Sequence, residues 1–389
     1  MDAKMLYVGM DGLDVAFQGA LGQRELNALE DAKERARAQS GPVVLELGPG
    51  RVKVQVMPVG RKEGFAFTLD TGPDGELIWV KRSIDLQQWN LFVSVRSAAL
   101  ATLGYERVKN RLLARLNGMG ARILSESINR VDVAVDFLAP GFQLDPAQFV
   151  AHPRCRRRQW GAMEETPGEE CLVNWHARAV SSVTIGAMPN RQVIVYDKRR
   201  EAIDKRKLHW FEIWGIPKDD KRLKVWRIEV RAGKNYLLDF GLRTFDDLDR
   251  MCGDILRVAT EQVRMLDAED ENPNVSRRRA AEIWNQARQA FLDVLAAPEE
   301  HVGPSKVRLL KRSEAWNCYV GMIGGMAASI AAAMGVQDDD PEAAAAIAYS
   351  AMRACFLNDP ERYKRALKRA RDRLVFITEG VADEHLSAA

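Results

Sequence analysis

RVDVAVDF (Arg130–Phe137) is the stretch of the 389-residue chain that decides the fold. Successive side chains of a β-strand point to opposite faces, so the three valines and the phenylalanine share one face. Arg130, Asp132 and Asp136 share the other. The apolar face predicts packing on a hydrophobic core, and the charged face places polar groups where a strand would normally bury apolar ones.

Two further segments are built in the same way. In VIVYDKRRE (Val193–Glu201), Tyr196 ends an apolar strand and is followed at once by Asp, three cations and Glu. In VWRIEVR (Val225–Arg231), the apolar residues share one face and the charged residues the other. If the three strands are neighbours in one sheet, a single polar face gathers six side chains: Asp132, Asp136, Tyr196, Lys198, Arg227 and Glu229.

Such a face would hold the parts of a phosphoryl-transfer site. Carboxylate oxygens bind a hard divalent cation such as Mg²⁺ or Mn²⁺, which polarises a phosphate while a hydroxyl attacks it. Because the pKa of a tyrosine is ordinarily about 10, Lys198 or the metal must stabilise the phenolate of Tyr196. Asp132 and Asp136 lie about 13 Å apart along an extended strand, so only one of them is expected to bind the ion directly. Attack on DNA would leave a 5′-phosphotyrosine and a free 3′-hydroxyl.

Each segment alone also has an ordinary explanation. A tyrosine at a strand end is usually structural, and an aspartate with an arginine two residues away usually forms an ion pair. Arg227 and Glu229 could form a surface salt bridge. The joint appearance of the three segments, in this order, favours a catalytic site.

The three segments resemble the replication initiation factor family. Its pattern is an R-[LIV]-D-x-x-x-D strand, a G-x-x-x-(S/N)-x strand running into Y-[DN]-K-x-x-E, and a W-R-x-E strand. Here the corresponding stretches are RVDVAVDF, IGAMPNRQVIVYDKRRE (Ile185–Glu201) and WRIEVR (Trp226–Arg231), and the resemblance covers residues 5–240. The family includes initiators of rolling-circle plasmids and filamentous phages, and related conjugative relaxases.

The resemblance implies a metal-dependent endonuclease that nicks one DNA strand and so starts rolling-circle replication. Tyr196 would be the nucleophile, assisted by Lys198 and Arg227. Asp132 and Glu229 are the first choices as metal ligands, with Asp136 and Glu201 in reserve. The five histidines are scattered, in agreement with a family that has no His-x-His metal site. Met188-Pro189-Asn190 departs from the usual Ser-containing turn.

Three other functions stay open from the sequence. A conjugative relaxase would use the same site at an origin of transfer. A DNA-binding regulator would carry an inert tyrosine, and a structural protein encoded by the same element would have no affinity for DNA.

Charge distribution bears on the partners. The net charge is only +3, but residues 191–234 hold 14 Lys and Arg against 7 Asp and Glu, which suits a phosphate backbone. Arg154 and residues 156–158 form a second basic cluster. Seven cations are the candidates for DNA contacts: Arg130, Arg191, Arg199, Arg200, Lys205, Arg206 and Arg231. Trp210 and Trp214 could stack on bases, although packing is favoured. Expected partners are origin DNA, single-stranded or cruciform, a host helicase and a second copy of the chain.

The overall pattern predicts an α+β protein. A mostly antiparallel sheet with helices over residues 25–38, 98–117 and 198–214 forms a nicking domain up to residue 240, and residues 241–389 form an all-α accessory domain. Residues 318–336 are nearly uncharged but rich in Ala, Gly and Met, which favours a tightly packed helix over a membrane span. The five separated cysteines and the absence of a signal-like N-terminus favour the cytoplasm.

Overall fold

One antiparallel sheet of eleven strands carries all three polar segments of the sequence, in the order β2-β3-β4-β5-β6-β1-β7-β12-β11-β10-β9. The structure is a computed structural model, and it describes residues 3–151, 171–176, 179–292, 294–296, 303–336 and 341–379. A two-stranded sheet joins β8 to β13. The strands are β1 (Lys4–Ala20), β2 (Val43–Leu47), β3 (Val52–Val56), β4 (Phe65–Asp70), β5 (Glu76–Lys81), β6 (Leu91–Val95), β7 (Arg122–Leu138), β8 (Phe149–Ala151), β9 (Cys171–His176), β10 (Ala179–Gly186), β11 (Arg191–Asp197), β12 (Val225–Gly233) and β13 (Val263–Met265).

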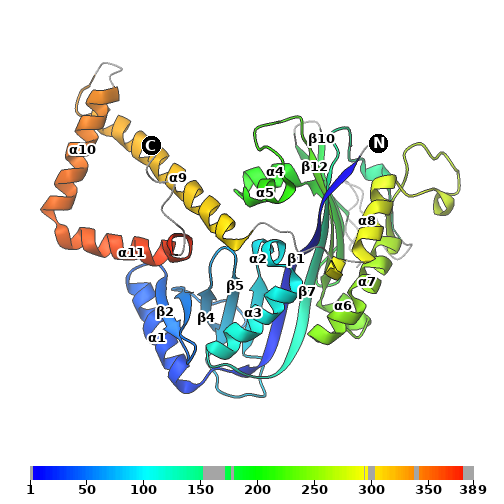
Figure 1. Cartoon of the computed structure of the whole chain (residues 1–389), viewed down its shortest axis with the longest axis horizontal. Coiled ribbons are helices and arrows are strands. Elements are labelled where there is room, and N and C mark those ends of the chain that lie inside the picture. The colour runs from blue at the N-terminus through cyan, green and yellow to red at the C-terminus, as the bar shows by residue number, and fades with distance from the viewer. Residues whose placement is uncertain are drawn as a thin grey trace, which may run out of the picture.

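Helices cover the sheet and extend beyond it (Figure 1). They are α1 (Gln23–Ala38), α2 (Ser97–Leu103), α3 (Tyr105–Gly118), α4 (Lys198–Asp204), α5 (His209–Trp214), α6 (Lys234–Asp239), α7 (Phe245–Gln262), α8 (Glu282–Leu292), α9 (Pro304–Ala333), α10 (Pro341–Asn358) and α11 (Pro360–Thr378). Short 3₁₀ turns lie at Pro146–Gln148, Val275–Arg277 and Val294–Ala296. The predicted α+β class, with a mostly helical C-terminal region, is confirmed.

β1 and β7 are the two longest strands, with 17 residues each, and they pair along almost their whole length. β6 pairs with the second half of β1, whereas β12 pairs with the second half of β7. The two long strands therefore join a six-stranded portion, β2 to β1, to a five-stranded portion, β7 to β9. β7, β12 and β11 are adjacent, so the condition that the sequence left open, that the three polar segments are neighbours in one sheet, is met.

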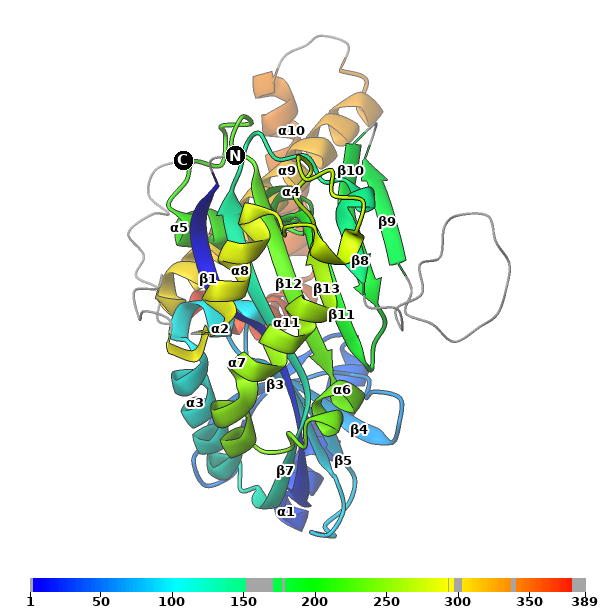
Figure 2. The ribbon, with the colours of Figure 1, turned by 90° about the vertical axis from the view of Figure 1, so that its right-hand side faces the viewer.

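Two helical layers enclose the five-stranded portion. α7 and α8 pack against β7, β11 and β12 on one face, where Leu248, Ile255, Trp284 and Phe291 join the main hydrophobic core. Figure 2 shows α6, α7 and α8 in front of these strands. α4 and α5 lie on the opposite face (Figure 1), where Trp210 and its neighbours form a smaller core. The sheet and α7–α8 share one core across the boundary predicted near residue 240, and that boundary stays a prediction.

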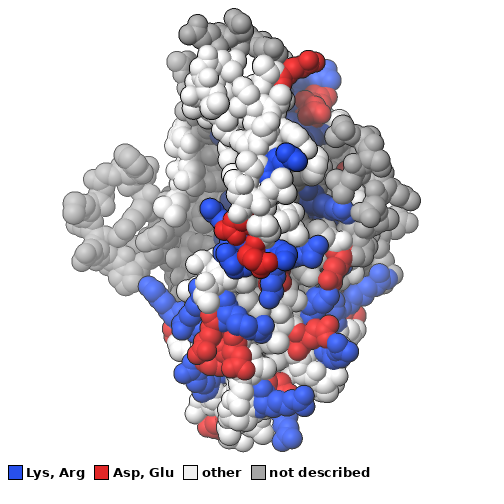
Figure 3. Space-filling view, turned by 90° about the vertical axis from the view of Figure 1, so that its left-hand side faces the viewer, with Lys and Arg blue, Asp and Glu red and all other residues white. Residues whose placement is uncertain are grey.

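α9, α10 and α11 form an arm that projects from the sheet (Figure 1). The prediction of a tightly packed helix over residues 318–336 is wrong in one respect: most of that stretch is helical in α9, but most of its side chains are exposed. Figure 3 shows the uncharged surface that results over α9 and α10. Among the described residues, no helix combines the length and the apolar character needed to cross a bilayer.

Other differences from the predicted elements have local causes. The helix expected over residues 98–117 is two helices, because Gly104 has a φ of 75°, a left-handed conformation that an α-helix cannot contain. The helix expected over residues 198–214 is also two, α4 and α5. The strands β5, β6, β8 and β13 were not predicted. β5 and β6 nevertheless show a strict alternation of buried and half-buried residues.

Candidate active site

The three polar strands align their functional residues in rows across the sheet. Asp136 on β7, Arg227 on β12 and Tyr196 on β11 are paired in register in one row. Asp132 and Arg231 are paired in a second row. Glu229 lies two residues from both Arg227 and Arg231, on the same face of β12. The register therefore brings the acidic residues of two strands close to the tyrosine of the third.

Tyr196 occupies the junction between β11 and α4. Asp197 caps α4 by accepting a hydrogen bond from the backbone N–H of Arg200 at 2.9 Å. The chain thus turns immediately after Tyr196, and this turn brings Lys198, the first residue of the helix, back beside the tyrosine. Lys198 Nζ lies 5.6 Å from the centre of the Tyr196 ring.

The Tyr196 hydroxyl has two polar neighbours. It donates a hydrogen bond to Glu229 Oε2 at 2.9 Å and accepts one from Lys198 Nζ at 3.4 Å. Burial and the Glu229 carboxylate raise the pKa of Tyr196 well above its usual value. Burial and the Arg227 guanidinium lower the pKa of Lys198. The half-buried phenol is therefore protonated at rest and directly bonded to a carboxylate that can accept its proton.

Asp132 and Glu229 form a buried pair of carboxylates beside the tyrosine. Arg231 Nε donates to Glu229 Oε1 at 2.6 Å and lies 3.9 Å from Asp132 Oδ2, so it stands between the two acids. Arg130 Nε donates to Asp132 Oδ1 at 2.8 Å. Gly12 on β1 makes room for Asp132, because a Cβ atom at position 12 would lie 2.7 Å from Asp132 Oδ2.

The protonation of Asp132 predicts a pH-dependent stability. Burial raises the pKa of Asp132 to about 7; the hydrogen bond from Arg130 opposes this shift, and the Glu229 carboxylate adds to it. The folded chain therefore holds this proton more tightly than the unfolded chain, whose pKa is near 3.8. The contribution to stability is complete below about pH 4 and is lost as the pH rises through about 7.

Asp132→Asn should remove this dependence. The free energy of unfolding of the natural chain, relative to Asp132→Asn, should fall between pH 5 and pH 8 when both are measured in urea. Asp220→Asn is the control, since the hydrogen bonds from Arg222 lower the pKa of the exposed Asp220 to about 2, below that window. If the difference in the free energy of unfolding between the natural chain and Asp132→Asn stays constant with pH, the raised pKa of Asp132 is contradicted.

Arg227 is placed behind the site rather than in it. It is fully buried, and its guanidinium donates to Asp136 at 2.6 and 2.7 Å and to Asp11 Oδ1 at 2.5 Å. Trp214 Nε1 donates to Asp136 Oδ2 at 2.8 Å, and the Trp210 ring lies 4.2 Å from the Arg227 guanidinium. Arg227 was predicted to assist Tyr196 in catalysis. In the structure its polar atoms are bonded to two carboxylates, which suits a positioning role.

Asp11, Trp210 and Trp214 complete this arrangement. The sequence prediction missed Asp11 because it lies in β1, far from the three segments along the chain. Its only signal was that it is one of two aspartates, with Asp14, in a mostly apolar strand. Both tryptophans are buried, so the favoured packing role is confirmed for each.

The four predicted metal ligands do not form one group. Asp136 is bonded to Arg227 and Trp214, as described above. Glu201 on α4 contacts three lysines, with Lys198 and Lys207 each at 2.9 Å and Lys205 at 3.3 Å. Burial would raise the pKa of Glu201, but Lys198 and Lys207 lower it to about 2. Within the described parts of the chain, no three Asp, Glu, His or Cys side chains are grouped so as to hold a metal ion.

The binding of a divalent cation by Asp132 and Glu229, the first choices from the sequence, stays a prediction. Both offer oxygen ligands, the type preferred by Mg²⁺ and Mn²⁺. Glu229 raises the pKa of Asp132, which shows repulsion between the two charges that a cation would relieve. All four predicted ligands are bonded to cationic side chains, because Asp132 is bonded to Arg130 and Glu229 to Arg231, just as Asp136 is bonded to Arg227 and Glu201 to Lys198. Which of the four bind a metal ion stays a prediction.

The predicted DNA contacts separate into three kinds. Arg191 is buried and donates to Ala259 O at 3.2 Å and Gln262 Oε1 at 2.9 Å, so its predicted contact with a phosphate is wrong in this structure. Arg130, Arg199 and Arg231 are half-buried, and Arg199 donates to Lys218 O at 2.7 Å.

Arg200, Lys205 and Arg206 lie on or just after α4, close to Tyr196 along the chain, and the last two are exposed. Their contacts with DNA stay a prediction. Arg154 and the cluster at residues 156–158 lie outside the described residues.

Comparisons with known proteins give a likeness in structure. No model of a protein family matches the chain, and no curated protein matches it significantly. A solved structure of the rolling circle replication initiator protein from Geobacillus stearothermophilus is similar to it, with 12% sequence identity and a TM-score of 0.39. The alignment covers 76% of this chain and 99% of that chain.

Proposed function

We propose that the chain is a metal-dependent endonuclease that nicks one strand of DNA through Tyr196 and initiates rolling-circle replication of a plasmid or phage-like element. One observation carries the proposal. A half-buried tyrosine hydroxyl donates to the carboxylate of Glu229 at 2.9 Å, within a face that also holds Asp132, Lys198 and Arg231. The resemblance of the three sequence segments to the replication initiation factor family supports the DNA substrate.

The proposed reaction transfers a phosphoryl group from DNA to tyrosine. Tyr196 Oη forms a bond to phosphorus as its proton passes to Glu229, and the bond from phosphorus to the 3′ oxygen breaks. The 3′ oxygen takes up a proton, which leaves a free 3′-hydroxyl for a polymerase and a 5′-phosphotyrosine on the protein. The covalent bond retains the energy of the broken phosphodiester, so a DNA 3′-hydroxyl can later attack the phosphotyrosine and rejoin the strand without a cofactor.

Neighbouring side chains have distinct parts in this proposal. The Lys198 ammonium, 3.4 Å from the Tyr196 hydroxyl, stabilises negative charge on the phenolic oxygen as the proton leaves. Arg231 and Arg130 hold Glu229 and Asp132 in place. A divalent cation bound by Asp132 and Glu229 would supply positive charge for the phosphate oxygens. Arg227 fixes the row of side chains behind the tyrosine.

A denaturing gel tests the function directly. The protein is incubated with labelled single-stranded origin DNA and Mn²⁺, and a band that keeps both label and protein in SDS is the expected product. The same reaction on origin-bearing plasmid should relax supercoiled DNA. If neither an adduct nor a nick forms with any divalent cation, the chain is no nuclease, and salt-dependent DNA binding without an adduct would favour the regulator instead.

Removal of the metal gives a second prediction. A chelator should abolish adduct formation, and Mn²⁺ should restore it, because two carboxylates without a cation leave the phosphate charge unopposed. Asp132→Asn should weaken Mn²⁺ binding at least about tenfold by electron paramagnetic resonance, since one of two charged ligands is removed. Asp220→Asn, on the surface, should bind as the natural chain does. Full activity in the chelator would refute the metal site.

A further inference from the structure

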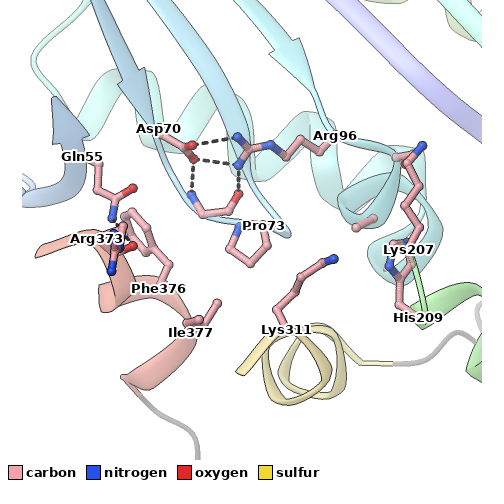
Figure 4. Close-up of a pocket in the computed structure, with 13 residues that line it drawn as sticks. Gln55, Asp70, Pro73, Arg96, Lys207, His209, Lys311, Arg373, Phe376 and Ile377 are labelled. Atoms are coloured by element: carbon pink, nitrogen blue, oxygen red, sulfur yellow. Dashed lines mark hydrogen bonds and ion pairs between the residues drawn. The ribbon is translucent and has the colours of Figure 1, made fainter. Parts of the chain in front are cut away.

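A second site, separate from Tyr196, lies where the arm returns to the sheet. Near the start of α9, Arg308 bonds Asp74 through two contacts of 3.0 Å. In the last turns of α11, the carbonyl groups of Asp372 and Arg373 accept from Gln55 on β3 at 2.5 and 3.1 Å. A cavity of about 500 Å³ lies between these attachments (Figure 4). Roughly 300–1,000 Å³ is the range of small-molecule sites.

Positive charge exceeds negative charge in the lining of this cavity. Four cationic side chains line it, Arg96, Lys207, Lys311 and Arg373, against the single carboxylate of Asp70. Asp70 is bonded to Arg96 through two contacts of 2.7 Å, so these two charges neutralise each other.

Lys207 and Lys311 also have partners outside the lining: each pairs with a carboxylate, and Lys311 donates in addition to the backbone carbonyl of Arg206. Lys207 pairs with Glu201 at 2.9 Å, and Lys311 with Glu314 at 2.8 Å. Each ammonium has three N–H groups, so these pairs orient the lysines without using all their donors.

His209 is the feature that points to a ligand. It lines the cavity and is only 4% exposed, yet neither ring nitrogen has a hydrogen-bond partner within the described residues. Leaving a buried polar group without a hydrogen bond is unfavourable, and a bound group that pairs with the ring would remove this cost. Burial and the nearby Lys311 lower the pKa of His209 to about 3, so the imidazole is neutral and has an N–H to donate.

The remaining lining is mostly apolar, with Gln55 and Ser97 as its polar members. Pro73, Ala98, Phe376 and Ile377 face the cavity, and Figure 4 shows Phe376 and Ile377 at the α11 end, across from Lys207 and His209. A ligand that satisfies both sides would combine an anionic group with a flat apolar one. Nucleotides have this chemistry, because their bases stack on aromatic and apolar side chains while their phosphates attract lysine.

We propose that this cavity binds a nucleotide unit, with its phosphate toward Lys207, His209 and Lys311 and its base against Pro73 and Phe376. The proposal is independent of the chemistry at Tyr196. The phosphate has two sources with the same chemistry, a free nucleotide or one unit of a single DNA strand. Either source would be held between the sheet and both ends of the arm.

Calorimetric titration of the full chain with thymidine monophosphate, inorganic phosphate and a six-residue oligothymidylate tests the proposal. Lys311→Gln and His209→Asn should each weaken binding about tenfold, the loss of one charge-assisted hydrogen bond. Lys364→Gln is the matched control: it removes the same charge from the exposed face of α11, where Lys364 pairs with Glu361 at 2.8 Å, and should bind normally. Lys311 is partly exposed, so its variant should fold even if His209→Asn does not.

The outcomes separate the sources and the two proposals. Tight binding of the monophosphate identifies a free nucleotide, whereas tight binding of the oligonucleotide alone identifies a DNA strand. Tyr196→Phe should leave either affinity unchanged, so a failure of the nicking proposal does not affect this result. The proposal is overturned if no probe binds at millimolar concentration, or if Lys311→Gln binds as tightly as Lys364→Gln.

Discussion

Tyr196→Phe should abolish the covalent DNA adduct and reduce strand nicking by several orders of magnitude, to the detection limit of the assay. The substitution removes one oxygen atom and keeps the ring that packs beside Lys198. No other group in the site can form the same phosphotyrosyl bond, and removal of a nucleophile is among the largest single effects on catalysis. Gel analysis of labelled origin DNA with Mn²⁺ measures the loss.

A second tyrosine supplies the control for this experiment. Tyr236 on α6 is buried, and its hydroxyl donates to Ile255 O at 3.2 Å, on the opposite side of the sheet from the site. Tyr236→Phe also removes a buried hydroxyl, but it should keep full nicking activity. DNA binding by Tyr196→Phe should survive, because no phosphate contact is assigned to the hydroxyl at rest. An adduct that persists in Tyr196→Phe would identify a different nucleophile.

Arg227→Met should lower the free energy of unfolding by about 3–5 kcal/mol, the usual cost of breaking a buried ion pair from one side. Arg227 is fully buried between Asp136 and Asp11. The Asp11 and Arg227 charges stabilise each other: burial lowers the pKa of Arg227, but Asp11 and Asp136 raise it well above its usual value. Loss of the guanidinium would leave two largely buried carboxylates without their main counter-charge, and urea unfolding at pH 7 measures the effect.

The surface pair of Arg222 and Asp220 provides the comparison. Arg222 bonds Asp220 through two contacts of 2.9 and 2.8 Å, but its side chain is 90% exposed. Arg222→Met should produce no measurable change in stability, because water screens such pairs. Lowering the pH should partly rescue Arg227→Met, since protonation of Asp11, whose pKa burial would raise but Arg227 holds low in the natural chain, removes an unpaired charge. Equal stability of Arg227→Met and the natural chain would show that the buried network is not structural.

The sequence was sufficient to predict the strands that carry the site, but not which charged side chains bond to one another. Alternation of apolar and charged residues placed Asp132, Glu229 and Tyr196 on the polar faces of their strands. The adjacency of these strands in the sheet then brings the three side chains together. The partners of each charge depend on side-chain packing, which periodicity does not encode. Arg227 is an example: its pattern suggested an exposed cation, whereas α5 covers it with Trp210 and Trp214.

Contacts between parts of the chain that are distant in sequence account for the other differences between the predicted and the observed site. Asp11 joins the Arg227 network only because β1 pairs with β7, a register that no local pattern reveals. The sequence suggested that Arg191, at the start of a strand, is a surface cation. In the structure α7 covers it and supplies the acceptors for its hydrogen bonds. His209 lines the cavity because α9 and α11 return to the sheet, far from α5 along the chain.

The two 17-residue strands have a consequence for how the molecule can be divided. β1 bonds β6 on one side and β7 on the other, so a fragment that lacked residues 21–121 would leave one long edge without hydrogen-bond partners. Such open edges recruit other chains and aggregate. The strands that hold Tyr196 in place therefore depend on strands in the other portion of the sheet. Both portions should unfold together in a single thermal transition.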